Sequence, residues 1–149
     1  MLLEMRKEDI FNYIGEEGAH FVQCISADFA CGAGIAVDFN KYFDIKNQLL
    51  FHYKRIWKGK GYCIKIPLIP VFNLVTKQYY YQKPTMNTMI QALLDFHSFY
   101  TKERMTSDAC TIYMPKIGCG LDKLKWMDVE EAIKEIFKDT DINIIVCYL

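Results

Sequence analysis

Two short glycine turns, far apart in the sequence, constrain the fold of this chain more than any other feature. They are residues 31–36 (Cys-Gly-Ala-Gly-Ile-Ala) and residues 117–122 (Ile-Gly-Cys-Gly-Leu-Asp). Each follows an apolar, strand-like segment and precedes a helical pattern. Glycine lets backbone N–H groups approach an anion closely, and the N-terminus of a following helix adds a favourable dipole. A lone Gly-X-Gly is usually a plain structural turn, but two of them indicate one diphosphate ligand held from both sides.

The composition is that of a folded domain without a strong overall charge. The chain has 149 residues, of which 52% are hydrophobic, so we expect one domain over residues 1–149 with a substantial core. Lysine plus arginine equals aspartate plus glutamate, 18 each, which excludes a broad basic footprint for duplex nucleic acid. One local run of basic residues can still attract polyanions, although such a run is more commonly a solvated face. It consists of Lys54, Arg55, Lys58 and Lys60.

The six cysteines and three histidines give no sign of a metal site. No Cys-X-X-Cys pair occurs and the histidines lack metal-ligand spacing, so we predict no metal and no cofactor. The N-terminus lacks the long apolar region of a signal peptide. We therefore expect reduced cysteines in a cytoplasmic protein, with access to the nucleus if the organism is eukaryotic. Residues 64–75 are apolar but interrupted by charge and proline, so we expect no contact with a membrane.

Strand-like and helical patterns alternate along the chain. Strands are predicted at residues 20–26, 62–66, 71–76, 109–114 and 142–148. Helices are predicted from Ile35 to about Leu50, from Pro84 and Thr85 onward, and around residues 129–137. The middle helix places Asn87, Gln91 and Asp95 on its solvent face, with His97 packed at the boundary. This alternation predicts an α/β domain, a mixed sheet between helical layers, with both glycine turns at the carboxyl ends of strands, where such sheets bind ligands.

Common catalytic motifs are absent, and two other residues are suggestive. The Gly-Lys-Ser/Thr ending of a P-loop, the third Rossmann glycine and a Gly-X-Ser-X-Gly elbow are all missing. Lys83 precedes a predicted helix N-terminus, where the dipole or burial would favour a neutral, nucleophilic amine. Asp122 ends the second glycine turn and would shuttle protons. The alternative is that Lys83 is an ordinary surface lysine and that Asp122 caps a loop.

Several segments, in order over almost the entire chain, resemble the macro domain family, and in particular its terminal ADP-ribose protein glycohydrolase branch. The most specific segment is residues 117–122 followed by Trp126. The other matching segments are residues 8–11, 23–28, 32–37, 74–77, 83–85, 114–116, 123–125 and 140–142. The resemblance implies a three-layer α/β/α sandwich with a central mixed β-sheet.

The resemblance also implies a ligand and a set of site residues. Macro domains bind ADP-ribose, and Asp9 resembles the aspartate that receives the adenine amino group, beside the Ile10 backbone. In this branch the lysine matching Lys83 attacks the distal ribose to form a covalent adduct, and the aspartate matching Asp122 assists its resolution. The remaining implied ADP-ribose contacts are Ser26, Gly32, Ala33, Gly34, Ile35, Ile117, Gly118, Cys119, Gly120 and Leu121.

The sequence departs from the general macro domain pattern at three places. At one of them, Ser26 and Asp28 stand where macro domains have an asparagine-rich segment after the first strand, as is usual in this branch. Glu8 replaces the usual glycine before the adenine-contacting aspartate. The segment before Lys83 is unusually aromatic, with tyrosines at 79, 80 and 81; they would form a stacking wall or, more commonly, cover a sheet edge. Cys31 and Cys119 lie in ligand loops as reactive thiols or, more commonly, as small apolar residues.

The expected function is removal of ADP-ribose from acidic protein side chains, or deacetylation of O-acetyl-ADP-ribose. The expected partners are ADP-ribose or ADP-ribosylated protein, with ADP-ribosylated nucleic acid as another target. Two alternatives stay open: a reader that binds ADP-ribose without cleaving it, and a phosphatase acting on ADP-ribose phosphate. We expect the chain to act as a monomer.

Overall fold

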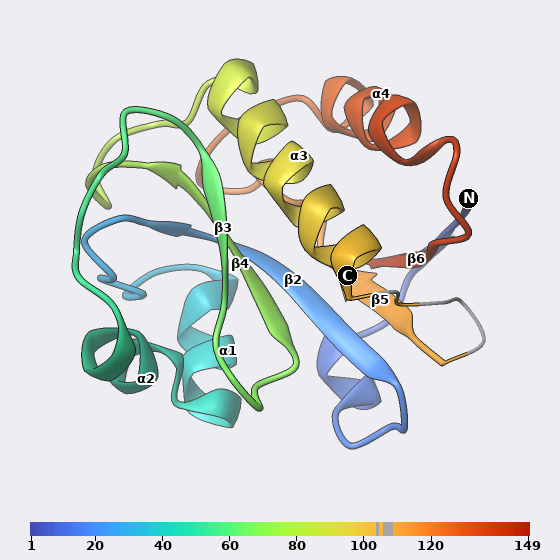
Figure 1. Ribbon diagram of the computed structural model, residues 1–149, viewed down its shortest axis with the longest axis horizontal. Helices are drawn as coiled ribbons and strands as arrows, with labels where there is room; N and C mark the ends of the chain where they lie inside the picture. Colours follow the sequence, from blue (N-terminus) through green and yellow to red (C-terminus); the bar gives the residue numbers. More distant parts are fainter. Residues whose placement is uncertain (104, 106–108) are drawn as a thin grey trace.

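The computed structural model describes residues 1–103, 105 and 109–149, and its centre is a six-stranded sheet (Figure 1). The strand order is β1-β6-β5-β2-β4-β3. All neighbouring strands are parallel except β3 and β4, which are antiparallel. The predicted mixed sheet is therefore confirmed. Its strands are β1 (Leu2–Arg6), β2 (Ala19–Ser26), β3 (Tyr62–Lys65), β4 (Val71–Lys77), β5 (Thr111–Met114) and β6 (Asn143–Cys147).

Helices lie on both faces of the sheet and complete the three predicted layers (Figure 1). One face is covered by α3 (Met86–Lys102) and α4 (Trp126–Phe137). The other is covered by α1 (Ile35–Phe43), α2 (Ile45–His52) and the 3-10 helix η1 (Ile10–Tyr13). Neighbouring strand residues enter opposite cores: Phe21 packs with α1, whereas Val22 packs with α3. Burial on both faces explains why the parallel strands read as continuous apolar runs.

Side chains of α3 form hydrogen bonds with the backbone of the edge strand β3 and of the residue before it. The Gly61 N–H donates to Gln91 Oε1 at 2.9 Å, and the Cys63 N–H donates to Asp95 Oδ2 at 2.7 Å. These bonds satisfy backbone groups that would otherwise be free to pair with another strand. The prediction that Gln91 and Asp95 face solvent is therefore wrong. Gly61 permits this approach, since a Cβ there would lie 1.9 Å from the Thr88 carbonyl oxygen.

Two predicted helices have different bounds in the structure. The helix expected from Ile35 to about Leu50 is two helices, because Asp44 adopts a left-handed conformation with φ of 53° that ends α1 and begins α2. Pro84 lies outside α3 rather than in its first turn. Thr85 is the N-cap, and its hydroxyl accepts a hydrogen bond from the Thr88 N–H at 3.1 Å.

The strand predictions were correct within one or two residues, apart from β1. The strand expected at residues 109–114 begins at Thr111. We did not predict β1, a short edge strand that pairs in parallel with β6. Its residues alternate irregularly between exposed and half-buried positions, so they carry little strand signal. No helix in the described part of the chain has the length and apolarity needed to cross a membrane.

Candidate active site

A cavity of roughly 730 Å³ opens at the carboxyl ends of β2, β4 and β5. These three strands are parallel and lie side by side in the sheet, so the loops that follow them meet at one edge. The cavity is lined by the end of β2, the loop into α1, the loop after β4 and the loop between β5 and α4. Both glycine turns therefore lie at the edge where the sequence predicted a ligand site.

The first glycine turn presents free backbone donors to the cavity. Gly34 has φ of 61° and ψ of −150°, a conformation that is accessible almost only to glycine. Within the described residues, the N–H groups of Ala33, Gly34 and Ile35 make no hydrogen bond. A Cβ at Gly34 would lie 3.5 Å from Leu121 Cδ1, so the two glycine turns come into contact. Free N–H groups at the start of α1 are suited to bind an anion.

The second glycine turn is held by its own hydrogen bonds. The Cys119 N–H donates to the Lys116 carbonyl at 3.1 Å, and the Leu124 N–H donates to the Gly118 carbonyl at 2.8 Å. Among the described residues, the N–H groups of Gly120 and Leu121 stay free. The second turn therefore adds free donors to the wall of the same cavity.

Asp28 connects two of the walls. Its Oδ1 accepts hydrogen bonds from Ser26 Oγ at 2.5 Å and from the Ala30 N–H at 3.1 Å, and its Oδ2 accepts one from the Tyr80 N–H at 3.0 Å. Burial alone would raise the pKa of Asp28, but these hydrogen bonds outweigh burial and lower it. We did not predict this role, although aspartate two residues after a strand is a common loop-organising residue.

The two predicted catalytic residues lie at the same end of the cavity. Lys83 Nζ donates to the carbonyl oxygen of Leu121 at 2.5 Å, directly before Asp122. Asp122 Oδ1 is 2.7 Å from Lys77 Nζ, and both side chains of this ion pair are mostly buried. The ion pair holds the Asp122 carboxylate in the cavity wall. Lys83 itself is exposed, so burial does not contribute to its chemistry.

A bulge at the end of β4 places Lys77 in this position. Ile25 of β2 pairs with Val75, but the next residue, Ser26, pairs with Lys77. Thr76 is therefore an extra residue in β4. The side chains that follow it no longer keep the regular alternation between the two faces of the sheet. Lys77 lies in one of the segments that resemble the family, but we predicted no role for it, because a bulge leaves no clear pattern in the sequence.

The remaining predicted ligand residues fall into two groups. Asp9 and Ile10 do not line the cavity: Asp9 is exposed and caps η1 by accepting from the Phe11 N–H at 3.0 Å, and Ile10 is buried. Cys119 is also outside the lining, and its thiol donates to the Ile117 carbonyl. The residues that do line it are Ser26, Gly32, Ala33, Gly34, Ile35, Ile117, Gly118, Gly120 and Leu121.

The thiols near the cavity have the character of packing residues. Burial raises the pKa of Cys31 to about 11 and also raises the pKa of Cys119, so both remain protonated at neutral pH. Among the described residues, no cluster of three or more His, Cys, Asp or Glu side chains is arranged to hold a metal ion.

The tyrosine segment does not cover a sheet edge. Tyr79, Tyr80 and Tyr81 are 41%, 65% and 67% exposed, on the loop that follows β4. Tyr80 and Tyr81 line the cavity, and the rings of Tyr79 and Tyr81 stack at 5.5 Å. The exposed rings belong to the wall of the site, as in the stacking alternative.

Comparison with known proteins identifies the class to which this fold and site belong. No protein-family model matches the chain. ADP-ribose glycohydrolase OARD1 of Bos taurus is 38% identical over 125 residues, which are 84% of this chain and 78% of the bovine protein. The human OARD1 is 38% identical over 123 residues, 83% and 77% of the two chains.

Solved structures agree on the fold. The macrodomain of Thermus aquaticus DarG superposes with a TM-score of 0.77 at 21% identity, over 99% of this chain and 98% of that one. Thermosipho africanus DarTG in complex with ADP-ribose gives a TM-score of 0.70 at 16% identity, over 100% of this chain and 42% of that one. The fold is therefore that of a macro domain. The chain belongs to the macro domain family, in the group that contains OARD1.

Proposed function

We propose that the protein is an ADP-ribosyl hydrolase that removes ADP-ribose from modified acidic side chains of proteins or from related O-acetyl-ADP-ribose substrates. The observation that carries the proposal is the placement of Lys83 and the Lys77–Asp122 ion pair at one end of a cavity walled by two glycine turns. The names of the OARD1 relatives and the ADP-ribose complex of the structural neighbour support it.

The diphosphate of ADP-ribose would lie between the two glycine turns. The free N–H groups of both turns and the N-terminus of α1 favour a doubly charged ligand there. The distal ribose would then extend toward Leu121, whose carbonyl accepts a hydrogen bond from Lys83 Nζ.

The proposed reaction has two steps. The lone pair of Lys83 Nζ forms a bond to the anomeric carbon of the distal ribose, while the target carboxylate leaves with the electron pair of the broken C–O bond. The proton lost by the amine passes to Asp122. Water then attacks the same carbon, the C–N bond breaks with its electrons returning to Nζ, and a proton relayed by Asp122 restores the amine.

Intact mass spectrometry tests this function directly. The protein is incubated with ADP-ribose and, separately, with a protein ADP-ribosylated on glutamate. We expect an adduct of ADP-ribose mass and loss of the label, both abolished by Lys83→Ala while ADP-ribose still binds. Lys125→Ala is the matched control, because Lys125 is exposed and makes no ion pair among the described residues.

Two results would contradict the mechanism. Full turnover by Lys83→Ala would exclude the lysine as nucleophile. Binding of ADP-ribose with neither adduct nor label loss would identify a reader of ADP-ribose instead of a hydrolase.

A further inference from the structure

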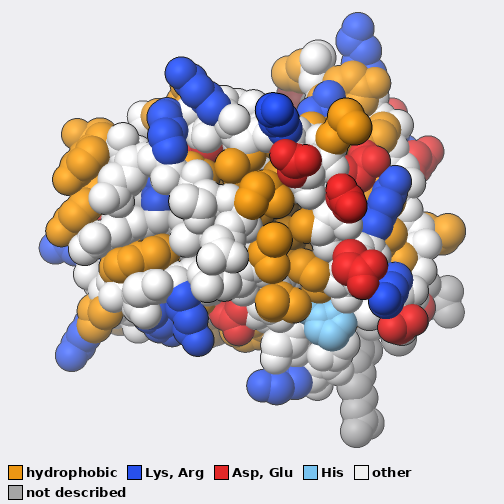
Figure 2. Space-filling view, turned by 90° about the horizontal axis from the view of Figure 1, so that it is seen from above, with side chains coloured by type: hydrophobic (Ala, Val, Ile, Leu, Met, Phe, Trp, Pro, Cys, Tyr) orange, Lys and Arg blue, Asp and Glu red, His pale blue; other side chains and the backbone are white. Residues whose placement is uncertain are grey.

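The wall of the cavity contains one carboxylate and several lysines. Among the described residues, Asp122 is the only acidic side chain that lines the cavity, whereas Lys77, Lys83 and Lys116 all line it. The excess of cations extends to the surface: lysines and arginines dominate the left half of the face seen in Figure 2, on the side where β2 and β4 end in Figure 1. One carboxylate cannot pair with all of these cations, so its choice of partner shapes the chemistry of the site.

The sequence explains why this carboxylate comes from a distant part of the chain. Residues 45–94 contain eight lysines and arginines and no aspartate or glutamate. Lys77 and Lys83 both belong to this segment, at the two ends of the loop that follows β4, and neither has a carboxylate nearby in the sequence. Asp122 approaches them from the second glycine turn. The two lysines therefore compete for the same carboxylate.

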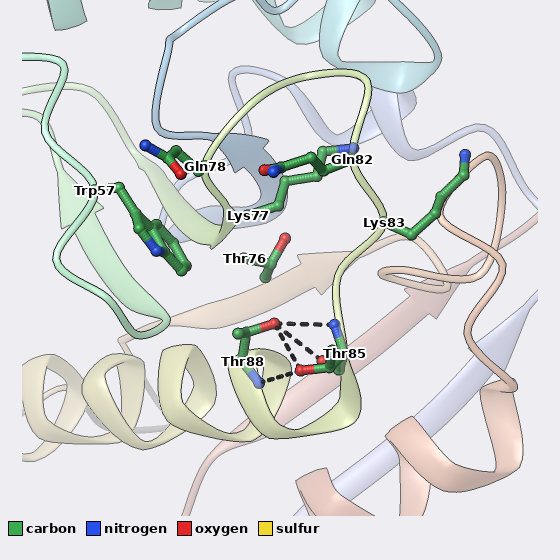
Figure 3. Close-up of a pocket in the computed structure, with 8 residues that line it drawn as sticks. All are labelled: Trp57, Thr76, Lys77, Gln78, Gln82, Lys83, Thr85 and Thr88. Carbon is green, nitrogen blue, oxygen red and sulfur yellow. Dashed lines mark hydrogen bonds between the residues drawn. The ribbon is translucent and has the colours of Figure 1, made fainter.

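In the structure, the two lysines bind different groups of that turn. Lys77 Nζ donates to Asp122 Oδ1 at 2.7 Å, in an ion pair that is mostly buried. Lys83 Nζ donates to the carbonyl oxygen of Leu121 at 2.5 Å and makes no ion pair among the described residues. Figure 3 shows Lys77 at the end of β4 and Lys83 extending away from the other labelled side chains. Lys83 thus lies one residue from a carboxylate with which it does not pair.

The β4 bulge brings Lys77 to this carboxylate. Ser26 pairs with Lys77, whereas regular pairing would bring it opposite Thr76. The bulge destabilises the strand locally, because Thr76 is 1% exposed and its hydroxyl has no hydrogen-bond partner among the described residues. Bulges are common next to active sites, where they change the direction of a side chain. The side chain that this bulge directs toward the site is that of Lys77.

The partner of Asp122 affects whether Lys83 can act as a nucleophile. A carboxylate in direct contact with an amine favours the charged ammonium form. An ammonium group has three donors and no lone pair, so it cannot attack carbon. While Lys77 binds the carboxylate, its positive charge offsets the negative charge of Asp122. Lys83 then lies close to a proton carrier without forming an ion pair with it.

We propose that Lys77 is a positioning residue that holds the Asp122 carboxylate away from Lys83. This role rests on the proposed function, in which Lys83 is the nucleophile and Asp122 moves protons. Without Lys77, Asp122 would pair with Lys83, because a mostly buried carboxylate without a partner is destabilising. The amine would then keep its proton to a higher pH, and the first step would be slower at neutral pH.

The other titratable groups around Lys83 do not replace Asp122 in this role. Asp28, which contacts the same loop through the Tyr80 N–H, already accepts three hydrogen bonds. The remaining titratable side chains that line the cavity carry no carboxylate; they are Cys24, Cys31, Tyr80, Tyr81 and Lys116. A change in the titration of Lys83 on loss of Lys77 is therefore expected to depend on Asp122.

NMR titration of the lysine side chains tests the proposal without any substrate. The protein is isotopically labelled at lysine Cε, and the Lys83 signal is identified by its loss in Lys83→Arg. We expect Lys77→Met to raise the titration midpoint of Lys83 by roughly 0.5 to 1 pH unit. Lys77→Met/Asp122→Asn should return the midpoint to the wild-type value, because no carboxylate is left to pair. Lys77→Arg should leave it unchanged, because the guanidinium keeps the ion pair.

Lys65→Met is the matched control for loss of a lysine charge. Lys65 is also partly buried and donates to a backbone carbonyl, that of Ile66, at 3.3 Å, but it does not line the cavity. It removes the same charge, and the Lys83 midpoint should stay at the wild-type value. Cooperative unfolding in urea shows that each variant is folded.

Single-turnover removal of ADP-ribose from a glutamate-modified protein gives a second readout. At neutral pH we expect Lys77→Met to be slower by roughly three- to tenfold, which corresponds to the expected shift of the midpoint. The rate should approach that of wild type as the pH is raised, and ADP-ribose affinity should change by less than about twofold. A merely structural role of Lys77 would instead lower the rate by the same factor at every pH.

Three results would overturn the role of Lys77. These are an unchanged Lys83 midpoint in Lys77→Met, an equal rise in Lys65→Met, and an equal rise in Lys77→Arg. A rise that persists in Lys77→Met/Asp122→Asn would also overturn it, because Lys77 would then act by repelling Lys83 and not through Asp122. If the wild-type protein releases no ADP-ribose, the proposed function fails, while the titration still decides whether Lys77 controls the partner of Asp122.

Discussion

The two glycine turns have the same sequence pattern but are held in the structure by different forces. The first, around Gly32 and Gly34, is open: a Cβ at Gly32 would meet only the Ala30 carbonyl at 3.8 Å. The second, around Gly118, is packed into the core, where a Cβ would lie 2.7 Å from Met89 Cε and 2.9 Å from Leu124 Cδ1. The first turn follows a loop that the Asp28 hydrogen bonds position, whereas the second is held by core packing in addition to its own hydrogen bonds.

This difference shows that Gly-X-Gly has no single physical meaning. In the first turn, Gly34 is required by its backbone angles at the start of α1. In the second, Gly118 is required by both its positive φ of 72° and its neighbours, whereas a Cβ added at Gly120 would have no neighbour within 4 Å. Four substitutions separate these reasons experimentally.

Gly118→Ala is expected to have the largest effect on stability. The methyl group would push against Met89, which is fully buried, and alanine would be strained at this φ. The two costs together predict a loss of about 3 kcal/mol in the free energy of unfolding. Urea denaturation measures it, with Gly15→Ala as a control that has a positive φ but no neighbour within 4 Å. Equal losses in the two variants would show that packing contributes nothing.

Gly34→Ala should cost less than Gly118→Ala. Its combination of φ and ψ excludes other residues, but the nearest side-chain atom, Leu121 Cδ1, is at an ordinary contact distance of 3.5 Å. Backbone strain alone predicts a loss of about 2 kcal/mol. Because the strain is local to the first turn, amide hydrogen exchange should rise at residues 30–36 and stay unchanged in β5. Uniform acceleration across the sheet would contradict this local assignment.

Asp28→Asn tests the polar links of the first wall. The amide cannot accept all three hydrogen bonds with the strength of a carboxylate, so we expect a loss of about 1.5 kcal/mol at neutral pH. The pKa of Asp28 is lowered in the folded protein. Its stabilisation is therefore complete above the ordinary carboxyl pKa and is lost as the pH falls through the lowered value.

The pH dependence of this variant supplies its own control. The difference in unfolding free energy between wild type and Asp28→Asn should shrink as the solution is acidified below about pH 4. Urea unfolding at a series of pH values measures it. A difference that is constant over this range would mean that the Asp28 charge is not stabilised by these bonds.

The fold was predictable from the sequence because its central strands are buried on both faces. Continuous apolar runs, glycine turns and helical stripes located β2, β4, β5, β6 and the helices that cover them. The split at Asp44 was not predictable, since a left-handed residue other than glycine leaves the apolar pattern of α1 and α2 uninterrupted. The edge strand β1 was missed for the opposite reason, because half-exposed residues show no pattern.

The site was predictable where it depends on glycine and on strand ends, and unpredictable where it depends on long-range geometry. The glycine turns and Lys83 line one cavity as expected. The Lys77–Asp122 ion pair depends on a bulge, and the Asp28 links depend on loops that meet only in the folded chain. Such contacts join residues that are distant in sequence, and no local pattern encodes them.

Gly120→Ala should have the smallest effect on stability and the clearest effect on binding. No atom lies within 4 Å of its added methyl and the backbone angle is ordinary, so the unfolding free energy should change by less than about 0.5 kcal/mol. Gly120 lines the cavity, however, and the methyl would occupy space that a diphosphate needs close to the free N–H groups. We expect ADP-ribose affinity to fall by roughly tenfold, which corresponds to about 1.4 kcal/mol. Isothermal titration calorimetry measures it. Unchanged affinity would place the diphosphate away from the second turn, and only the first turn would then hold it.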